Sequence, residues 1–454
     1  MLLGDGSKDK AIERGWEAAT AIPHGGARAI VLSMPGFRRL DGELLCDGVS
    51  LSAIARETRT PVYVYSRELI EENYRLFDEA FSPVPHLVCY AAKANSNLAI
   101  LKLLASLGAG VDVVSGGELR AALESGFAAD RIVFSGVGKT DDELRLGVAY
   151  GVLAINAESK RELERIDAIA GALHRTARVA LRVNPDIDAK SHPYISTGLA
   201  HNKFGVPISR ALDIYRGSRA LHHVRMVGVQ AHIGSQILEA EPLAQMAREL
   251  SALALRLTAE GFALETLDVG GGLGVGAEGS DDSANFSPEA YASAVLPHLA
   301  GLTLRILCEP GRAIVSRAGA LVTRVVGVKE NGGKLFVVTD AGMNDMIRAP
   351  LYGAVHAIEP VADLRSEIAM VDVVGPVCET SDFFAQDVLL PVPGEGDLLA
   401  IRDTGAYGFA MASNYNFRPK PAEVWVDGDS WKVIRRRETY EDLVRLESTV
   451  DPTT

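Results

Sequence analysis

Eight short apolar runs, each rich in β-branched residues, alternate with helical patterns between residues 86 and 310. Each run ends in a polar residue or a glycine. Eight β-then-α units in about 250 residues are what a closed (β/α)8 barrel of the TIM type requires. An open, doubly wound sheet is the competing architecture, but it usually has about five to seven strands. The runs cover residues 86–93, 109–115, 131–136, 151–156, 178–184, 226–232, 266–272 and 305–310.

Helix starts between these runs are marked by residues that cap a first turn. Ser115 with Glu118, and Thr140 with Glu143, have the spacing of capping boxes, in which each side chain accepts a backbone N–H of the partner residue. Residues 96–108 repeat leucine at helical spacing and stop at a glycine. These signals predict helices between the strands.

The pattern changes after about residue 317, where apolar and polar residues alternate around Asn331-Gly332 and again around Asp427-Gly428. Such pairs are strong signals for tight hairpins, so an antiparallel β-barrel or sandwich domain is expected at the C-terminal end. The predicted divisions are an extension (1–35), strands that pack with the C-terminal domain (36–65), the barrel (66–316), the β domain (317–445) and a tail (446–454).

Composition and charge exclude several classes of protein. The net charge of −13 argues against nucleic acid or an anionic membrane as the main partner. No stretch approaches the ~20 apolar residues of a membrane span, and the N-terminus has no signal-peptide core. Cys46, Cys89, Cys308 and Cys378 are far apart and lack zinc-ligand spacing. We therefore expect a reduced, cytoplasmic protein without a metal.

Polar residues gather where the predicted barrel strands end. In barrels of this kind the βα loops converge at the carboxyl ends of the strands, so these side chains are expected to share one site. In chain order they are Lys93, Asp112 with Ser115, Asn156, Arg182, His232 with Ser235, Gly270 to Gly272, and Glu309 with Arg312.

Lys93 is the centre of this predicted site. A lysine in a partly desolvated cavity has a lowered pKa and becomes a nucleophilic amine, suited to a Schiff base with an aldehyde. The alternatives are a lysine that reaches solvent and one that pairs with a barrel carboxylate.

Other strand ends supply groups that a phosphorylated pyridine aldehyde needs. Gly270 to Gly272 would let backbone N–H groups approach a phosphate, and His232 could lie flat against a ring. Glu309 could keep a pyridine nitrogen protonated, although an ion pair with Arg182 or Arg312 is equally compatible with its position. Together these groups predict pyridoxal 5′-phosphate (PLP) as the cofactor.

Six motifs resemble those of the diaminopimelate decarboxylases, within the barrel-type (fold type III) PLP decarboxylases that also include ornithine and arginine decarboxylases. They are "YAAKAN", "HIGSQ", "DVGGGLG", "EPGRAIV", "GPVCETSDFFAQD" and "GAYGFAMASNYNFRPKPAEV", and the similarity covers about residues 36 to 445. The resemblance implies an alanine racemase-like PLP-binding barrel with a C-terminal β domain.

The resemblance also implies roles for residues. Lys93 would carry the cofactor, His232 would stack on its ring, and Tyr407 would reach both phosphate and substrate. The implied cofactor site comprises Lys93, Asp112, Arg182, His232, Ser235, Gly270, Gly271, Gly272, Glu309, Gly311, Arg312 and Tyr407.

The implied substrate contacts are Arg312, Arg348, Tyr352, Glu379 and Tyr407. Diaminopimelate differs from lysine and ornithine by a second carboxylate, which the planar fork of arginine can bind through two hydrogen bonds. Glu379 could bind the adjacent distal amine, as an acidic residue does in decarboxylases of simple diamines.

Cys378 and Glu379 are implied to cross a head-to-tail homodimer interface and complete the partner's site. Taken alone, Cys378 would be a small buried hydrophobe, but its neighbours favour an exposed thiol. The implied catalytic residues are Lys93, Cys378 and His232, with Cys378 as the leading proton donor.

The implied reaction is decarboxylation of meso-2,6-diaminopimelate to L-lysine and CO2, the last step of lysine biosynthesis. An ornithine or lysine decarboxylase on the same scaffold is the nearest rival. A catalytically silent homologue that binds partners would be expected to lack Lys93 or Cys378, and both are present.

Overall fold

A computed structural model describes residues 36–188, 198, 202–276 and 287–447. The predicted extension (1–35) and most of the predicted tail (446–454) lie outside these residues. Within the described ranges, no helix is long and apolar enough to cross a membrane.

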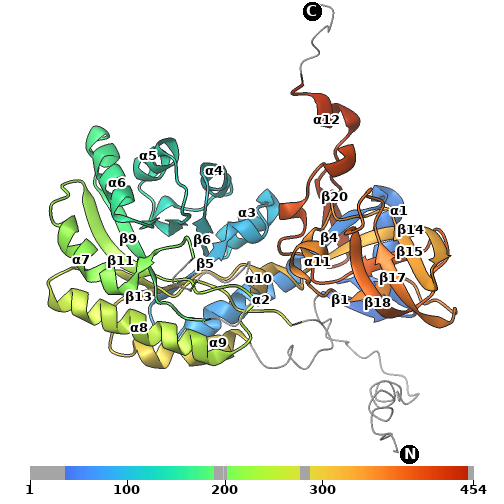
Figure 1. The fold of residues 1–454 in the computed structure, drawn as a ribbon, viewed down its shortest axis with the longest axis horizontal. Helices are drawn as coiled ribbons and strands as arrows, with labels where there is room; N and C mark the ends of the chain where they lie inside the picture. Colours follow the sequence, from blue (N-terminus) through green and yellow to red (C-terminus); the bar gives the residue numbers. More distant parts are fainter. Residues whose placement is uncertain (1–35, 189–197, 199–201, 277–286, 448–454) are drawn as a thin grey trace, which may run out of the picture. The chain divides into compact units, whose positions relative to one another are not determined.

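Eight parallel strands close into a barrel, as predicted (Figure 1). Neighbouring strands pair in the order β9, β11, β12, β13, β5, β6, β7, β8, and the pairing of β8 with β9 closes the ring. An open sheet is therefore excluded. The strands are β5 (His86–Ala91), β6 (Gly110–Val113), β7 (Ile132–Phe134), β8 (Ala154–Ala157), β9 (Ala177–Asn184), β11 (Val224–Gln230), β12 (Thr266–Asp268) and β13 (Arg305–Cys308), with short β10 (Val206–Pro207) beside β9.

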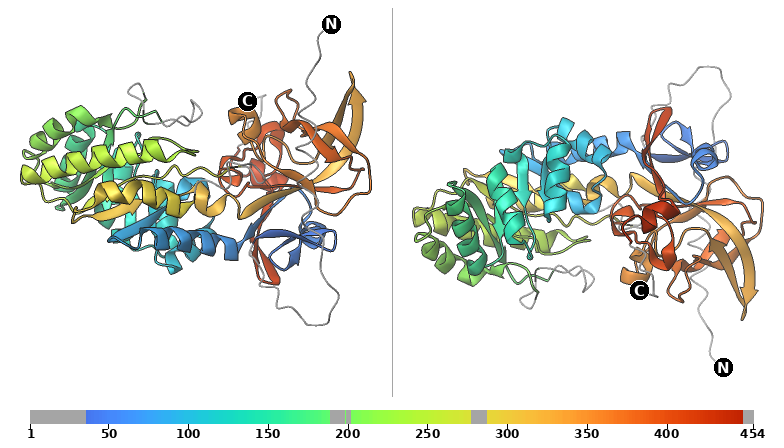
Figure 2. Two further views of the ribbon diagram at one scale, coloured as in Figure 1. Left: turned by 90° about the horizontal axis from the view of Figure 1, so that it is seen from below. Right: turned by 90° about the horizontal axis from the view of Figure 1, so that it is seen from above.

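Helices lie outside the parallel strands in all three views (Figures 1 and 2). Their apolar stripes face inward: in α3, Leu101 and Leu104 are fully buried while Lys102 between them is exposed. The helices are α2 (Arg67–Phe81), α3 (Leu98–Ser106), α4 (Gly116–Glu124), α5 (Asp141–Tyr150), α6 (Lys160–Ala172), α7 (Ile208–Ser218), α8 (Ala240–Ala259), α9 (Pro288–Leu299) and α10 (Arg312–Val315).

The two predicted capping boxes differ in the structure. Thr140 and Glu143 form the full reciprocal box at the start of α5. Ser115 accepts the Glu118 N–H at 3.1 Å, but the Glu118 carboxylate accepts the Val114 N–H at 2.8 Å instead of the Ser115 N–H. The predicted capping box at Ser115 was therefore wrong in one of its two bonds, because the Glu118 carboxylate accepts from Val114, one residue before Ser115.

The C-terminal strands form a mixed sheet rather than a purely antiparallel one. β15 pairs in parallel with β17, and β20 pairs in parallel with β4 (Val62–Ser66), a strand that precedes the barrel in the chain. The other pairings are antiparallel. The strands are β14 (Gly319–Asn331), β15 (Lys334–Thr339), β16 (Ile358–Pro360), β17 (Ile368–Val374), β18 (Phe383–Pro391), β19 (Leu398–Ile401), β20 (Ala422–Asp427) and β21 (Ser430–Arg435).

Both predicted hairpins form, each with its turn one residue later than expected. Asn331 pairs with Lys334, so the turn residues are Gly332 and Gly333, with φ of 60° and 79°. In the second hairpin Gly428, with φ of 57°, opens the turn. Positive φ at the first turn position suits glycine and matches the twist of a two-residue hairpin.

Smaller elements complete the fold. A three-stranded sheet and its helix precede β4, and two short helices belong to the C-terminal part. These elements are β1 (Phe37–Leu40), β2 (Glu43–Cys46), β3 (Val49–Ser50), α1 (Leu51–Thr58), α11 (Arg348–Tyr352) and α12 (Tyr440–Val444).

The segment that carries Lys93 is held from the β domain side. It is a turn of 3₁₀ helix, Ala92–Ala94, directly after β5. The Tyr407 N–H donates to the Ala94 carbonyl at 2.8 Å, and Asn97 donates to the buried Glu423 carboxylate of β20 at 2.9 Å. The position of Lys93 therefore depends on both parts of the chain.

Candidate active site

A cavity of about 500 Å³ lies over the carboxyl ends of the barrel strands. It brings together most of the residues predicted from the sequence, and a smaller adjoining hollow adds Gly272 and Gly311. Of the predicted residues, those that line the main cavity are Lys93, Arg182, His232, Ser235, Glu309, Arg312, Arg348, Tyr352 and Tyr407.

Lys93 forms an ion pair with the buried Asp112 of β6, at 3.0 Å between Nζ and Oδ2. Burial lowers the pKa of Lys93, but the nearby Asp112, Tyr407 and Glu309 outweigh burial and raise the pKa above its ordinary value. The expected lowered pKa was therefore wrong for the chain without its cofactor. The amine is held as an ammonium, and the alternative of a carboxylate partner is the one observed.

Glu309, at the end of β13, presents a carboxylate that is only half satisfied. Gln230 donates to Oε2 at 3.2 Å, whereas Oε1 is buried without a donor; the neighbouring side chain is the Asp268 carboxyl, which when ionised can only accept. Burial and the charges of Asp112 and Asp268 raise the pKa of Glu309 well above its ordinary value. An uncompensated buried carboxylate is costly unless a cation or donor meets it. A protonated pyridine nitrogen would meet this need, so the site fits the ring of PLP.

His232 is neutral and oriented by the glycine loop. The Gly271 N–H donates to Nδ1 at 3.3 Å, which places the ring proton on Nε2. Burial lowers the pKa of His232, and the charges of Lys93 and Arg182 lower it further. A neutral ring in the cavity wall suits contact with a flat cofactor.

The glycine loop after β12 is required by close backbone packing. A Cβ on Gly271 would lie 2.1 Å from the Glu309 carbonyl oxygen, and one on Gly272 would lie 2.3 Å from that of Gly234. The Gly270 N–H already donates to Asp268 and the Gly271 N–H to His232. Among the described residues, only the Gly272 amide of these three has no protein acceptor, so the predicted phosphate nest offers fewer free donors than expected.

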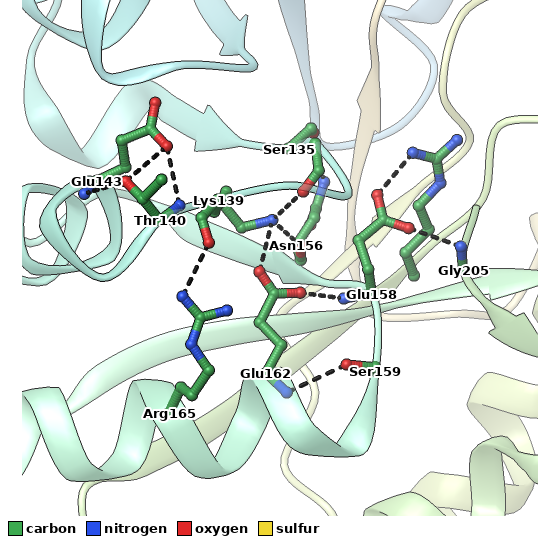
Figure 3. Close-up of polar contacts among 12 residues, drawn as sticks. Ser135, Lys139, Thr140, Glu143, Asn156, Glu158, Ser159, Glu162, Arg165 and Gly205 are labelled. Carbon is green, nitrogen blue, oxygen red and sulfur yellow. Dashed lines mark hydrogen bonds and ion pairs between the residues drawn. The ribbon is translucent and has the colours of Figure 1, made fainter. Parts of the chain in front are cut away.

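A buried charge network supports the β7 to β9 side of the cavity (Figure 3). Arg182 pairs with Glu158 at 2.9 Å and stacks 4.7 Å from the centre of the Phe204 ring. Lys139 donates to the carbonyl of Asn156 at 2.8 Å and pairs with Glu162 at 3.1 Å. The Glu162 carboxylate also accepts the Glu158 N–H at 2.7 Å, which links the two ion pairs. Arg182 therefore lines the cavity with its charge already balanced.

Sequence reasoning missed several members of this site. Gln230, Asp268 and Glu158 lie at or directly beyond the ends of β11, β12 and β8, so strand-end position was the signal that could have found them. No comparable signal marked Lys139, because it lies in a loop beyond β7.

Arg312 and Arg348 bring two buried guanidinium groups to the cavity without a carboxylate partner among the described residues. Arg312 lies over the Tyr407 ring, 4.8 Å from its centre, and its buried Nε has no hydrogen-bond partner. Burial and Arg312 lower the pKa of Arg348 to about 9. Two such groups together favour an anionic ligand.

Cys378 and Glu379 do not line the cavity of their own chain. Both are exposed, between β17 and β18; the Cys378 N–H donates to Asn416 at 2.9 Å, and Glu379 accepts from Ser381 at 2.6 Å. The exposed thiol agrees with the prediction from its neighbours. No group of three or more His, Cys, Asp or Glu in the described ranges could hold a metal ion.

Comparison with known families gives the identity of the barrel. Residues 67–316 match the model of the pyridoxal-binding domain of pyridoxal-dependent decarboxylases. The chain belongs to the pyridoxal-dependent decarboxylases. A buried Glu309 oxygen without a partner and a cavity centred on Lys93 agree with this membership.

Several relatives of this decarboxylase are named diaminopimelate decarboxylase. Diaminopimelate decarboxylase from Pseudomonas aeruginosa is 47% identical, over 91% of this chain and 99% of that protein. The structure of diaminopimelate decarboxylase from Helicobacter pylori in complex with L-lysine is 46% identical, with a TM-score of 0.84 over 87% of this chain and 98% of that one. The M. jannaschii enzyme, also with L-lysine, is 37% identical, with a TM-score of 0.86 over 92% and 98%.

Proposed function

We propose that this pyridoxal-dependent decarboxylase converts meso-2,6-diaminopimelate to L-lysine and CO2, the last step of lysine biosynthesis. One observation carries the choice of substrate: Arg312 and Arg348 face the Lys93 cavity without carboxylate partners in the described part of the chain. A substrate with a second carboxylate would provide the missing negative charge. The names of the relatives support the same choice.

Bound PLP would supply an aldehyde for amines and a protonated ring that accepts the electrons of the breaking C–C bond. Lys93 is the residue that would hold the aldehyde, and Glu309 would hold the proton at the ring nitrogen. His232 would lie against the ring. Ser235, the Gly272 amide and Tyr407 are placed around the smaller hollow, where they would hold the phosphate.

Arg312 and Arg348 would bind the carboxylate at the far end of the substrate, with Tyr352 beside them. Such anchoring fixes the reacting end of the substrate relative to Lys93, and orientation of this kind accounts for much of an enzyme's rate. Glu379 of the partner subunit would bind the neighbouring amine.

We further propose a cytoplasmic head-to-tail homodimer with shared active sites. The exposure of Cys378 and Glu379, and their absence from the cavity of their own chain, support a role in the site of a second copy. Cys378 of the partner subunit would return a proton to the substrate carbon after CO2 leaves.

An assay of the holoenzyme with meso-diaminopimelate, its LL isomer and L-ornithine tests this function. We expect lysine as the product of the meso isomer, with kcat/KM at least about 100-fold above that for ornithine, because ornithine leaves the arginines without their ligand. Lys93→Ala should lose both the yellow colour and the turnover. Equal rates with ornithine would favour the rival diamine-forming decarboxylase instead.

A further inference from the structure

His356 contacts the buried side of the proposed carboxylate-binding arginine. It follows α11 in the chain, is only 6% exposed, and lies outside the residues that line the cavity. Arg348 Nε lies 3.3 Å from His356 Nε2, and His356 Nδ1 lies 2.9 Å from the carbonyl oxygen of Arg402.

One protonation state satisfies both contacts. The Arg402 carbonyl can only accept, so Nδ1 must carry the proton and donate it. Nε2 then has a free lone pair, which accepts from Arg348. A protonated imidazolium would instead direct an N–H at the guanidinium. In agreement, burial and the charge of Arg348 lower the pKa of His356 to about 4.

The partner of Arg348 differs in kind from those of two other buried arginines in this chain. Arg182 pairs with Glu158 at 2.9 Å, and Arg402 pairs with Glu359 at 2.7 Å. Those carboxylates fix their arginines and also balance their charge. The imidazole fixes Arg348 through Nε but leaves the positive charge uncancelled, and within the described ranges no residue accepts from the terminal amino groups, which leaves them for a ligand.

We propose that His356 is a positioning residue for substrate recognition: as a neutral acceptor it directs Arg348 toward the distal carboxylate of the substrate without neutralising it. This inference rests on the proposed function and deepens it. The part of the ligand whose binding depends on His356 is then its α-amino carboxylate end, which L-lysine also has.

Two ligands that differ only in this group test the inference. L-lysine has the carboxylate, and cadaverine (1,5-diaminopentane) is the same molecule without it. For the holoenzyme with His356→Leu, measured by calorimetry, we expect L-lysine to bind about tenfold more weakly, equivalent to about 1.4 kcal/mol, while cadaverine affinity stays unchanged. His356→Gln offers a neutral acceptor and should restore lysine affinity.

Two further variants sharpen the test. His356→Glu would hold Arg348 more firmly but cancel its charge, so lysine should again bind about tenfold more weakly even though the anchor is stronger. His86→Leu is the matched control, because His86 also has both ring nitrogens bonded, to Val84 and Asp78, at the other end of β5. It should leave the ratio of lysine to cadaverine affinity unchanged.

The outcomes separate this inference from the proposed function. Equal weakening of both ligands in His356→Leu, or an unchanged affinity ratio in both the Leu and Glu variants, would overturn the role of His356. If the wild-type holoenzyme does not decarboxylate meso-diaminopimelate, the proposed function fails first. If the wild type decarboxylates meso-diaminopimelate but the ratio of lysine to cadaverine affinity is unaltered in the His356 variants, only the proposed role of His356 is rejected.

Discussion

Lys93 shares its surroundings with three buried carboxylates, those of Asp112, Asp268 and Glu309. One ammonium cannot balance three carboxylates. Burial first, and the charges of neighbouring carboxylates second, raise the pKa of Glu309 and bring the pKa of Asp268 to about 6. The chain therefore folds with more acid than base at this point. A cationic cofactor ring would correct the imbalance.

This imbalance predicts a pH-dependent effect of Glu309→Gln in the cofactor-free protein. The pKa of Glu309 is higher in the folded than in the unfolded protein, so its contribution to stability is complete below the unfolded pKa, about 4. This contribution is lost as the pH rises through the folded pKa. The wild type should therefore lose stability relative to Glu309→Gln as the pH rises from 5 to 8. Urea unfolding of both proteins at the two pH values measures this difference. A difference that does not change with pH would refute the assigned ionisation.

Single residues show both the strength and the limit of prediction from sequence. Lys93 and Glu309 could be found because they follow strands of a recognisable barrel. The protonation of Lys93 could not, because Asp112 reaches it through the pairing of β5 with β6, where Ala91 lies opposite Asp112. His356 gave no signal, since its partner carbonyl is 46 residues further along the chain.

The loop after β12 shows how an element places the site. Glycine at 270 and 272 has φ of 65° and 101°, and a Cβ on Gly271 would meet the backbone of Glu309. Because backbone cannot move aside as a side chain can, this loop sets the distance between β12 and the end of β13.

Gly271→Ala should therefore disturb both stability and cofactor binding. We expect a loss of about 3 kcal/mol in unfolding free energy and markedly weaker PLP binding, because the new methyl group would clash with the Glu309 carbonyl. Gly217→Ala in α7 is the control, since nothing lies within 4 Å of its added Cβ. Denaturant unfolding and PLP titration measure both effects. Equal unfolding free energies and equal PLP binding of the two variants would show that the loop can move to accommodate the added methyl group.

Elements were predicted better by type than by pairing. Strand and helix periods are local, so all eight barrel strands could be recognised. The direction of β20 against β4 could not, because the alternation of side chains is the same for parallel and antiparallel neighbours, and the partners are far apart in the chain. The first of the two turns was off by one residue because two adjacent glycines, 332 and 333, both accept positive φ.

At the scale of the whole molecule, the proposed shared site predicts complementation between inactive variants. Lys93→Ala and Cys378→Ala should each be nearly inactive alone. After mixing, unfolding and refolding, random pairing would make half of the dimers mixed, and each of these has one intact site, so about a quarter of wild-type activity should return. Activity that stays near zero would place Cys378 outside the partner's site.

The bonds from Asn97 to Glu423 and from Tyr407 to Ala94 have a consequence for how such a chain can change over time. The segment matched by the family, residues 67–316, contains the reactive amine and its ion-pair partner Asp112, but not Glu423 and Tyr407. A gene fragment that encoded the barrel alone would therefore lack two of the bonds that hold the segment around Lys93. If recombination exchanged the barrel or the β domain, the new partner would have to provide residues that make the bonds of Glu423 and Tyr407 to the Lys93 segment.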